Sequence, residues 1–169
     1  SREVRHSMIA VRPAHIVDAA ELALKLRQAD LQEIKSAVSE YPLVLLEQSI
    51  AWSDPCFSII GEGGNPIAIF GVVPDSCAAD VGRIWFLGSD ELIHHSITFL
   101  RYSRKWIDKL HERYPTLWNY VDARNEVHVR WLKWCGFVFL RRIEEYGVEQ
   151  RPFYEFERIT PAPRRTAGD

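Results

Sequence analysis

The sequence has few cysteines, and their spacing suggests neither a metal site nor a disulfide framework. The three cysteines, Cys56, Cys77 and Cys135, are far apart, and none belongs to a CxxC pair or to a cluster with histidines. Structural zinc sites and small disulfide-stabilised domains need such groupings. Their absence excludes both classes, and we expect a protein of a reducing cytoplasm without a bound metal.

The sequence also lacks long apolar runs and a large excess of charge of either sign. Its longest apolar run, 66–73, has the length of a buried strand and falls short of the roughly 18 residues that a membrane-spanning helix needs. The 21 basic and 23 acidic residues leave a net charge of −2. We therefore expect no membrane partner and no nucleic-acid partner, because these require an apolar span or a positive field.

A single methionine separates the expected domain from a short polar segment. We interpret residues 1–7, which precede Met8, as a remnant ahead of the natural start. Residues 8–159 are predicted to form one domain, because 47% of the chain is hydrophobic and 12% is aromatic, which is enough for one core. Residues 160–169 contain two prolines, two arginines and no apolar periodicity, and we expect a disordered tail there.

Residue patterns predict four helices and seven strands. Apolar residues recurring about every 3.6 positions predict helices, including one that starts with a cap at Asp18 and runs to Val38. Gly136 is expected to end the last helix, and the glycines of 61–66 are expected to form a hairpin turn. In chain order we expect strand 8–13, helices 18–38 and 43–52, strands 57–60, 67–73 and 81–87, helix 95–113, strand 117–122, helix 125–134, and strands 137–143 and 153–159.

The segment after strand 117–122 carries a resemblance to a known family. Asp122-Ala-Arg-Asn125 leads into a short helix, and Phe137, directly after Gly136, follows Asn125 by twelve residues. Together with the element order, this arrangement resembles the GNAT (Gcn5-related N-acetyltransferase) superfamily over residues 9–159. The resemblance implies an α/β (α+β) three-layer fold, with a mixed, mostly antiparallel sheet whose fourth and fifth strands are splayed apart.

Other segments resemble a narrower group, the small GNAT-like proteins of short-tailed bacteriophages, some of which are internal virion proteins. The segments that carry this resemblance are 26–34, 69–72, 84–88, 99–104 and 114–117. It implies that the protein acts in the cytoplasm of a bacterial host or within the virion.

The GNAT resemblance also implies which residues would contact acetyl-CoA. The backbone of Trp85, Phe86 and Leu87 would hold the thioester in the splay. Asn125 matches a family position that contacts the cofactor, and it is equally suited to cap the helix that follows. Ser96 stands at the start of the long helix, beside the expected diphosphate site.

The sequence departs from the catalytic members at that diphosphate site. Those members carry a Gln/Arg-x-x-Gly-x-Gly/Ala loop, whose glycines let backbone N–H groups approach the phosphates. Here Glu91, His94 and Ser96 stand at the three motif positions, and Leu132 replaces the tyrosine that protonates the leaving thiolate. We therefore expect a degenerate acetyl-CoA site and no firmly bound cofactor, because these side chains crowd and repel a diphosphate.

Two groups of residues are candidates for chemistry if the protein is an enzyme. His94 and His95 lie beside Asp90, and a carboxylate can orient an imidazole as a base. Consecutive helical residues point about 100° apart, so at most one of the two histidines can face a cleft. The acidic residue also suits the first turn of a helix without any catalysis.

A second group is suited to substrate binding. Asp30 and Glu33 share one helix face and would receive a cationic amine, although a solvated face with nearby lysines explains them equally well. Asp122 ends the fifth strand beside the splay and is a third substrate candidate.

The aromatic residues near the splay have two possible roles. Trp85, Phe86, Trp131 and Trp134 either belong to the core or fill the gap that a pantetheine arm would occupy. In the second role, the side chains would replace the cofactor groove with a packed wall.

Two functions follow from these features. The altered motifs favour a bacteriophage GNAT-like protein that acts by binding a protein partner, either a phage structural protein or a host enzyme that it modulates. The alternative is an acetyl-CoA-dependent N-acetyltransferase acting on a protein or small-molecule amine. The aromatic content also suits a homodimer interface.

Overall fold

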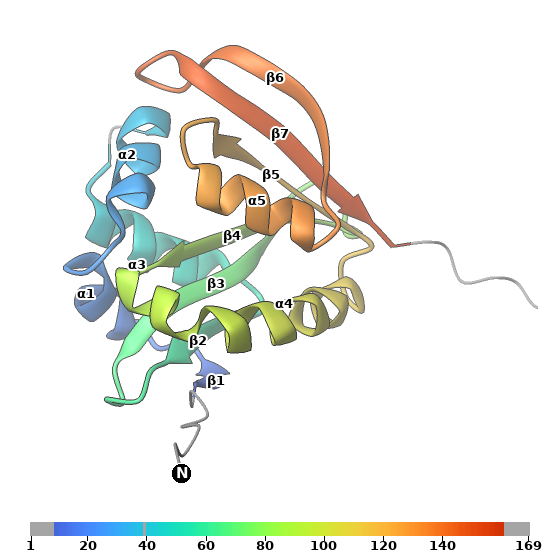
Figure 1. The fold of residues 1–169 in the computed structure, drawn as a ribbon. Coiled ribbons are helices and arrows are strands. Elements are labelled where there is room, and N and C mark those ends of the chain that lie inside the picture. The colour runs from blue at the N-terminus through green and yellow to red at the C-terminus, as the bar shows by residue number, and fades with distance from the viewer. Residues whose placement is uncertain (1–8, 39, 161–169) are drawn as a thin grey trace, which may run out of the picture.

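The computed structural model describes residues 9–38 and 40–160, which form seven strands, five α-helices and one 3₁₀ helix (Figure 1). The strands are β1 (Ala10–Pro13), β2 (Cys56–Ile60), β3 (Pro66–Pro74), β4 (Val81–Gly88), β5 (Thr116–Asp122), β6 (Val138–Tyr146) and β7 (Arg151–Ile159). The helices are α1 (Asp18–Ala23), α2 (Gln28–Ala37), α3 (Pro42–Trp52), α4 (Ser96–His111) and α5 (Glu126–Trp134), and the 3₁₀ helix η1 (Asp90–His95) precedes α4.

The seven strands form one mixed sheet in the order β1-β2-β3-β4-β5-β7-β6. The pairing of β4 with β5 is parallel, and the pairings of the other neighbours are antiparallel. β4 and β5 pair only from Val81 and Thr116 to Arg83 and Trp118. Beyond that point they separate, which confirms the predicted splay between the fourth and fifth strands.

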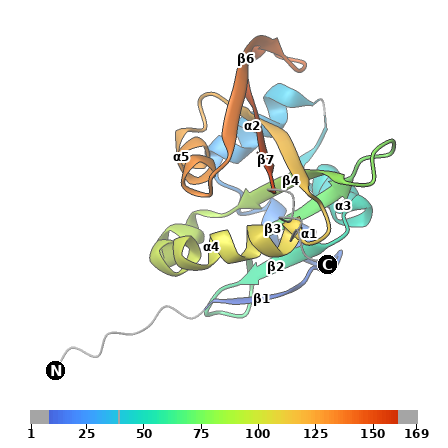
Figure 2. The same cartoon turned by 90° about the vertical axis from the view of Figure 1, so that its right-hand side faces the viewer.

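Helices cover both faces of the sheet, as the predicted three-layer fold requires (Figures 1 and 2). Helices α1, α2 and α3 pack on one face, and α4 and α5 pack on the other. Each face has its own apolar core. The first core includes Leu22, Leu26, Ile34, Leu46 and Ile69, and the second includes Ile84, Phe99, Leu117, Leu132 and Phe156.

The prediction of one helix over 18–38 is wrong, because the chain forms two helices there. Between α1 and α2, Leu26 makes a β-bridge with Ser89, and the Arg27 N–H donates to the Gly88 carbonyl oxygen at 2.9 Å. This segment is therefore extended along the end of β4. For this reason residues 9–38 and 40–160 form five α-helices instead of the predicted four.

Asp18 is the first residue of α1, and its carboxylate has a different role from the predicted cap. It accepts hydrogen bonds from the Arg12 guanidinium at 2.8 and 2.9 Å, from the His15 N–H at 2.9 Å and from the Ser58 hydroxyl at 2.7 Å. Burial alone would raise the pKa of Asp18, but these donors lower it to about 2. The carboxylate thereby ties α1 to β1 and β2.

Three glycines of the described residues, Gly64, Gly136 and Gly147, have left-handed backbone that permits the observed turns. Gly136, with φ of +85°, directly follows the end of α5 and confirms the predicted stop. Gly147, with φ of +68°, lies in the β6–β7 turn directly against the end of α2. A Cβ at Gly147 would lie 2.5 Å from the Ser36 carbonyl oxygen and 2.7 Å from the Ala37 Cα, so only glycine allows this contact.

The predictions for residues 1–7 and for 161–169 fall outside the described residues. Thr160, the first residue of the expected tail, donates its N–H to the Pro115 carbonyl oxygen at 2.8 Å. In the described part of the chain, no helix combines the length and the apolar character needed to cross a bilayer.

Candidate functional site

The separation of β4 and β5 opens a cleft of about 500 Å³, with α2 and α3 on one side and α5 and the C-terminal strands on the other. Trp52, Pro74 and Asp75 are exposed at its rim, whereas Ile84 and Leu132 are buried in its lining. The lining is mainly apolar and rich in aromatic residues, a composition typical of ligand and protein-binding sites. Its aromatic residues are Trp52, Trp85, Phe86, Trp118, Tyr120, Trp131, Tyr146, Phe153 and Phe156.

Glu33 is half-buried, and it lines this cleft. The Asp122 N–H donates to its Oε1 at 2.8 Å, which joins α2 to the end of β5. Burial raises the pKa of Glu33 to about 8, and the negative charges of Asp30 and Asp122 act in the same direction. At neutral pH the carboxyl therefore retains its proton, and it can both donate and accept hydrogen bonds in the cleft.

Replacing Glu33 with glutamine is expected to change how stability depends on pH. Because the pKa of Glu33 is higher in the folded chain than its usual 4.5, the folded state binds more protons between these values, and wild-type stability falls as pH rises through that range. Glu33→Gln keeps an oxygen for the Asp122 N–H and removes the ionisation. At about pH 8.5 it should increase the free energy of unfolding by on the order of 3 kcal/mol.

Urea unfolding at about pH 5 and about pH 8.5 measures this difference. The matched control is Glu47→Gln on the exposed side of α3, which should leave the wild-type pH dependence intact. A Glu33→Gln protein that loses as much stability as wild type between the two pH values would contradict the assignment.

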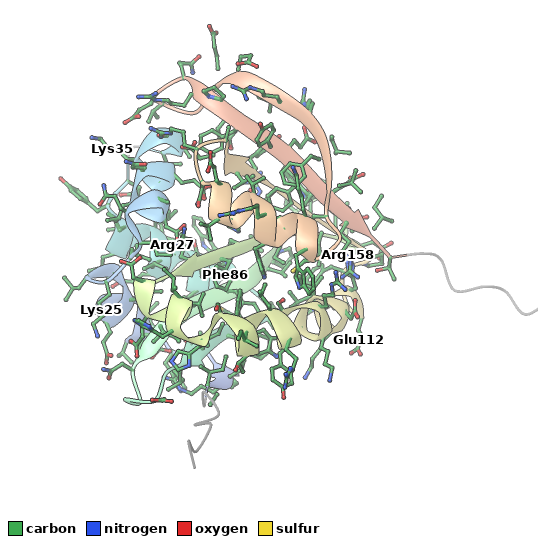
Figure 3. All side chains as sticks on the ribbon, viewed as in Figure 1. Lys25, Arg27, Lys35, Phe86, Glu112 and Arg158 are labelled. Atoms are coloured by element: carbon green, nitrogen blue, oxygen red, sulfur yellow. The ribbon has the colours of Figure 1, made fainter. Side chains whose placement is uncertain are left out.

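An aromatic cluster separates the cleft from the α4 and α5 side of the sheet. The Phe86 ring lies 5.2 Å from that of Trp131 and 5.4 Å from that of Phe99, and the Phe99 and Trp131 rings stack at 5.5 Å. Figure 3 places Phe86 between α4 and α5. Phe86 and Trp131 pack as the aromatic wall that we considered for this region. Trp134 is 48% exposed and does not belong to it.

His128 completes this wall from α5, with its ring centroid 6.2 Å from that of Phe86. Burial lowers the pKa of His128 to about 4, so the imidazole is neutral at pH 7. Among the described residues, His128 Nδ1 and Trp131 Nε1 are buried without a hydrogen-bond partner. Both residues line the cleft, and these two atoms are unused polar groups in an otherwise apolar wall.

A buried polar network closes the end of the splay, where β4 meets α5. Asp30 is 1% exposed, and its carboxylate accepts the Gly88 N–H and the Asn125 Nδ2–H, both at 3.1 Å. The Arg27 guanidinium donates to Asp30 and to the Asn125 Oδ1, each at 3.4 Å. The alternative interpretation, that Asp30 lies on a solvated helix face, is therefore wrong. Figure 3 shows Lys25 and Lys35 at the outer edge and Arg27 turned inward.

A second network fixes the β6–β7 turn over α2. Asp122 forms an ion pair with Arg124 at 2.7 Å, and Arg124 Nη2 donates to the Ser36 hydroxyl at 2.7 Å. Ser36 donates in turn to Glu149 at 3.1 Å. This chain of contacts holds one wall of the cleft in place.

The expected diphosphate site lies where the 3₁₀ helix η1 meets the start of α4. The 3₁₀ helix runs directly into α4, and the Ser96 N–H donates to the Ile93 carbonyl oxygen. His94 is exposed and His95 is buried, in line with the argument that at most one of them faces inward. Asp90 and Ser96 are exposed on the surface, and Glu91 lies against Gly61 in the β2–β3 turn.

The structure brings together some of the residues predicted from sequence and separates others. Trp85, Phe86, Leu87 and Glu33 line the cleft. Asp30, Asp122 and Asn125 lie at its closed end, and Asn125 has both side-chain atoms in hydrogen bonds instead of capping α5. His94, His95, Asp90 and Ser96 lie on η1 and at the start of α4, outside the cleft lining.

Sequence reasoning missed Arg27, His128 and Tyr146. The i, i+3 spacing of Arg27 and Asp30 signals an ion pair on one helix face, and it forms, with both side chains largely buried. His128 lies three and four positions before Trp131 and Leu132, so it shares their inward face. No local pattern identifies Tyr146, which reaches the cleft only through the pairing of β6 with β7.

These residues do not fit acetyl-CoA. The Gly88 N–H at the end of β4 and the Asn125 amide are held by Asp30. The aromatic cluster fills the space beside β4, and the side chains of His94 and Ser96 stand where the phosphate loop needs glycines. Residues 9–38 and 40–160 contain no group of three or more His, Cys, Asp or Glu side chains that is arranged to hold a metal ion.

Comparison with known sequences identifies relatives among phage proteins. The sequence pattern of the family described as "Bacteriophage T7, probable scaffold protein Gp13" matches residues 60–146. The probable scaffold protein gp13 of Escherichia phage T7 is 38% identical over 105 residues, which cover 56% of this chain and 71% of the T7 protein.

Comparison with solved structures identifies the fold as that of the GNAT acetyltransferases. The ribosomal-protein-S18-alanine N-acetyltransferase of Escherichia coli has a TM-score of 0.68 at 14% identity, covering 94% of this chain and 98% of that protein. A GNAT-family acetyltransferase of Streptococcus pneumoniae has a TM-score of 0.61 at 16% identity, covering 91% and 100%. The microcin C7 self-immunity acetyltransferase, solved with acetyl-CoA and AMP, has a TM-score of 0.66 at 13% identity, covering 90% and 92%. Identities this low establish the fold and leave activity open.

Proposed function

The chain belongs to the family of the bacteriophage T7 probable scaffold protein Gp13, and from this membership we propose that it acts in phage particle assembly by binding a phage structural protein. In this proposal the GNAT fold is a rigid framework for protein contacts, and the chain acts in the cytoplasm of the infected bacterium, where particles are built. We favour a phage structural partner over a host enzyme because the relatives are probable scaffold proteins.

The observation that supports a binding role is the buried network around Asp30. It uses the Gly88 N–H, the Asn125 amide and the Arg27 guanidinium to join α2, β4 and α5. In a GNAT enzyme, this end of the splay leads to the cofactor. A network that satisfies these polar groups internally stabilises the fold and leaves few of them for a nucleotide.

Calorimetry with acetyl-CoA tests this proposal. We expect no heat of binding at about 1 mM ligand, because the diphosphate would meet η1 and the pantetheine arm would meet the aromatic cluster. The microcin C7 self-immunity acetyltransferase is the positive control, since its structure holds acetyl-CoA. A dissociation constant below about 100 μM would contradict the proposal.

A second candidate function is N-acetyl transfer to a protein or small-molecule amine. It is favoured by the cleft of about 500 Å³ and by the Glu33 carboxyl that lines it. The two functions are separated by incubating the protein with acetyl-CoA and either spermidine or polylysine. Mass spectrometry then detects any acetylated amine. Product above the level of a protein-free control would support transfer.

A further inference from the structure

The outer sides of α4 and α5 form one continuous surface, on the face of the sheet opposite α1 to α3. The two helices run side by side in the same direction (Figure 1). The Phe99 and Trp131 rings stack at 5.5 Å, and Cys135 Sγ lies 3.7 Å from Ser103 Oγ. Beside this contact, the Arg104 guanidinium lies over the Trp134 ring at 4.2 Å and donates to the Trp134 carbonyl oxygen at 2.7 and 2.9 Å.

Large apolar side chains are exposed along this surface. Ile97 is 76% exposed, Val127 54% and Trp134 48%, and Ile93 and Leu100 are exposed as well. Ile97, Leu100 and Arg104 have i, i+3, i+7 spacing on α4, as do Val127, Arg130 and Trp134 on α5. Each stripe therefore presents apolar and basic side chains on the same side of its helix. Exposed apolar groups edged by charge are typical of protein interaction sites.

The charge of the two helices differs from that of the whole chain. Together α4 and α5 carry six exposed cations against two exposed carboxylates, whereas the whole chain has a net charge of −2. The cations are Arg101, Arg104, Lys105, Lys109, Arg130 and Lys133, and the carboxylates are Asp108 and Glu126. Arg158 pairs with Asp108 at 2.9 Å, which leaves the surface with a positive potential.

We propose that this α4–α5 face, defined by Ile97, Leu100, Arg101, Val127, Arg130 and Trp134, binds an acidic amphipathic helix of the partner protein. The proposal rests on the proposed function, because it names the chemistry of the structural partner. Leucine-like side chains of the partner would cover the apolar residues between α4 and α5, and its carboxylates would meet the arginines.

The charge pattern argues against the other occupants. A symmetric dimer through this face would bring the cations of both copies together, which costs free energy in an isologous contact. A nucleic acid would pair with the cations and leave Ile97 and Val127 without apolar contacts. An acidic helix with an apolar side satisfies both sets of residues.

Fluorescence anisotropy with a labelled peptide tests the α4–α5 face. The probe is a helical peptide of about 16 residues with leucine at i, i+3, i+4 and i+7 positions and glutamate elsewhere. The face variant is Ile97→Ser, Arg101→Glu and Arg130→Glu. The control variant is Leu24→Ser, Lys25→Glu and Lys35→Glu, which reverses two cations and removes one apolar side chain at exposed positions of the opposite layer.

We expect the wild type and the control variant to bind the peptide within about twofold of each other, and the face variant to bind at least about tenfold more weakly. Binding should weaken as salt increases. The proposal is overturned if the wild type does not bind the peptide, if both variants lose binding equally, or if an oligonucleotide binds as tightly as the peptide. It is also overturned if the wild type dimerises and the face variant does not.

Phage complementation separates this inference from the proposed function. In a phage that lacks its own copy, the wild type and the control variant should restore particle yield, and the face variant should not. Full yield with the face variant would contradict the docking surface and leave the assembly role intact. Full yield without any copy of the chain would contradict the assembly role itself.

Discussion

Replacing Asp30 with alanine is expected to lower the free energy of unfolding by about 4 kcal/mol, a large share of the stability of one domain. Asp30 is 1% exposed and accepts hydrogen bonds from Gly88, Asn125 and Arg27. Its removal leaves the buried Gly88 N–H and the buried Asn125 amide N–H without an acceptor, and it leaves the Arg27 guanidinium with only the Asn125 Oδ1. Urea unfolding followed by tryptophan fluorescence measures the loss.

Asp108→Ala is the matched control for this prediction. Asp108 pairs with Arg158 at 2.9 Å, but its side chain is 65% exposed. Exposed ion pairs contribute about 1 kcal/mol or less, so this variant should be close to wild type. Asp30→Asn should also be costly, because its amide places a donor where three donors converge. If Asp30→Ala costs no more than Asp108→Ala, the network does not hold α2, β4 and α5 together.

Replacing Phe86 with alanine is expected to cost about 3 kcal/mol of unfolding free energy. Phe86 contacts the rings of Phe70, Phe99 and Trp131 at centroid distances between 5.2 and 6.3 Å. Truncation removes these contacts and leaves a cavity in the wall between the cleft and the α4–α5 face. Urea unfolding at neutral pH measures this cost as well.

Phe86→Leu provides the comparison, because it keeps most of the apolar volume and should cost below about 1.5 kcal/mol. An alanine variant that loses less than about 1 kcal/mol would show that the cluster is not tightly packed. It would also weaken the case against acetyl-CoA, since a loose wall could yield to a pantetheine arm. Calorimetry of Phe86→Ala with acetyl-CoA therefore belongs in the same experiment.

Local patterns predicted most of the strands and the ends of several helices. The hairpin of β2 and β3 and the antiparallel pair of β6 and β7 follow from alternation and turn glycines, which act between near neighbours. Gly136 ends α5 because the left-handed backbone that it adopts disfavours other residues. These features depend on energies within a few residues, so the sequence alone indicates them.

The division of 18–38 into α1 and α2 could not be predicted in the same way. Apolar spacing continues through Leu22, Leu26 and Ile34, as in a single helix. The break arises because the chain near Leu26 bonds to Gly88 and Ser89, which lie more than sixty residues later. Hydrogen bonds to a distant strand outweighed local helix propensity there.

The candidate site shows the same division. Sequence reasoning selected Asp30, Glu33, Asp122 and Asn125 as separate candidates, by charge, spacing and resemblance. It did not show that Asp30 bonds to Asn125, because 95 positions separate them. Nor did it show that His128 and Tyr146 reach the same cleft from α5 and β6.

The sequence by itself determined the order of the helices and strands along the chain, because periodicity and residue identity are local properties. The class of fold and the altered phosphate loop followed from its resemblance to the GNAT superfamily. Only the tertiary structure decided whether each polar group faces water or another residue. Folding brought Arg27, Asp30, Gly88 and Asn125 into one buried network and left Ile97, Arg101 and Arg130 on an open surface. The free energy of a polar group depends on its surroundings, and those surroundings come from parts of the chain that are far apart in sequence.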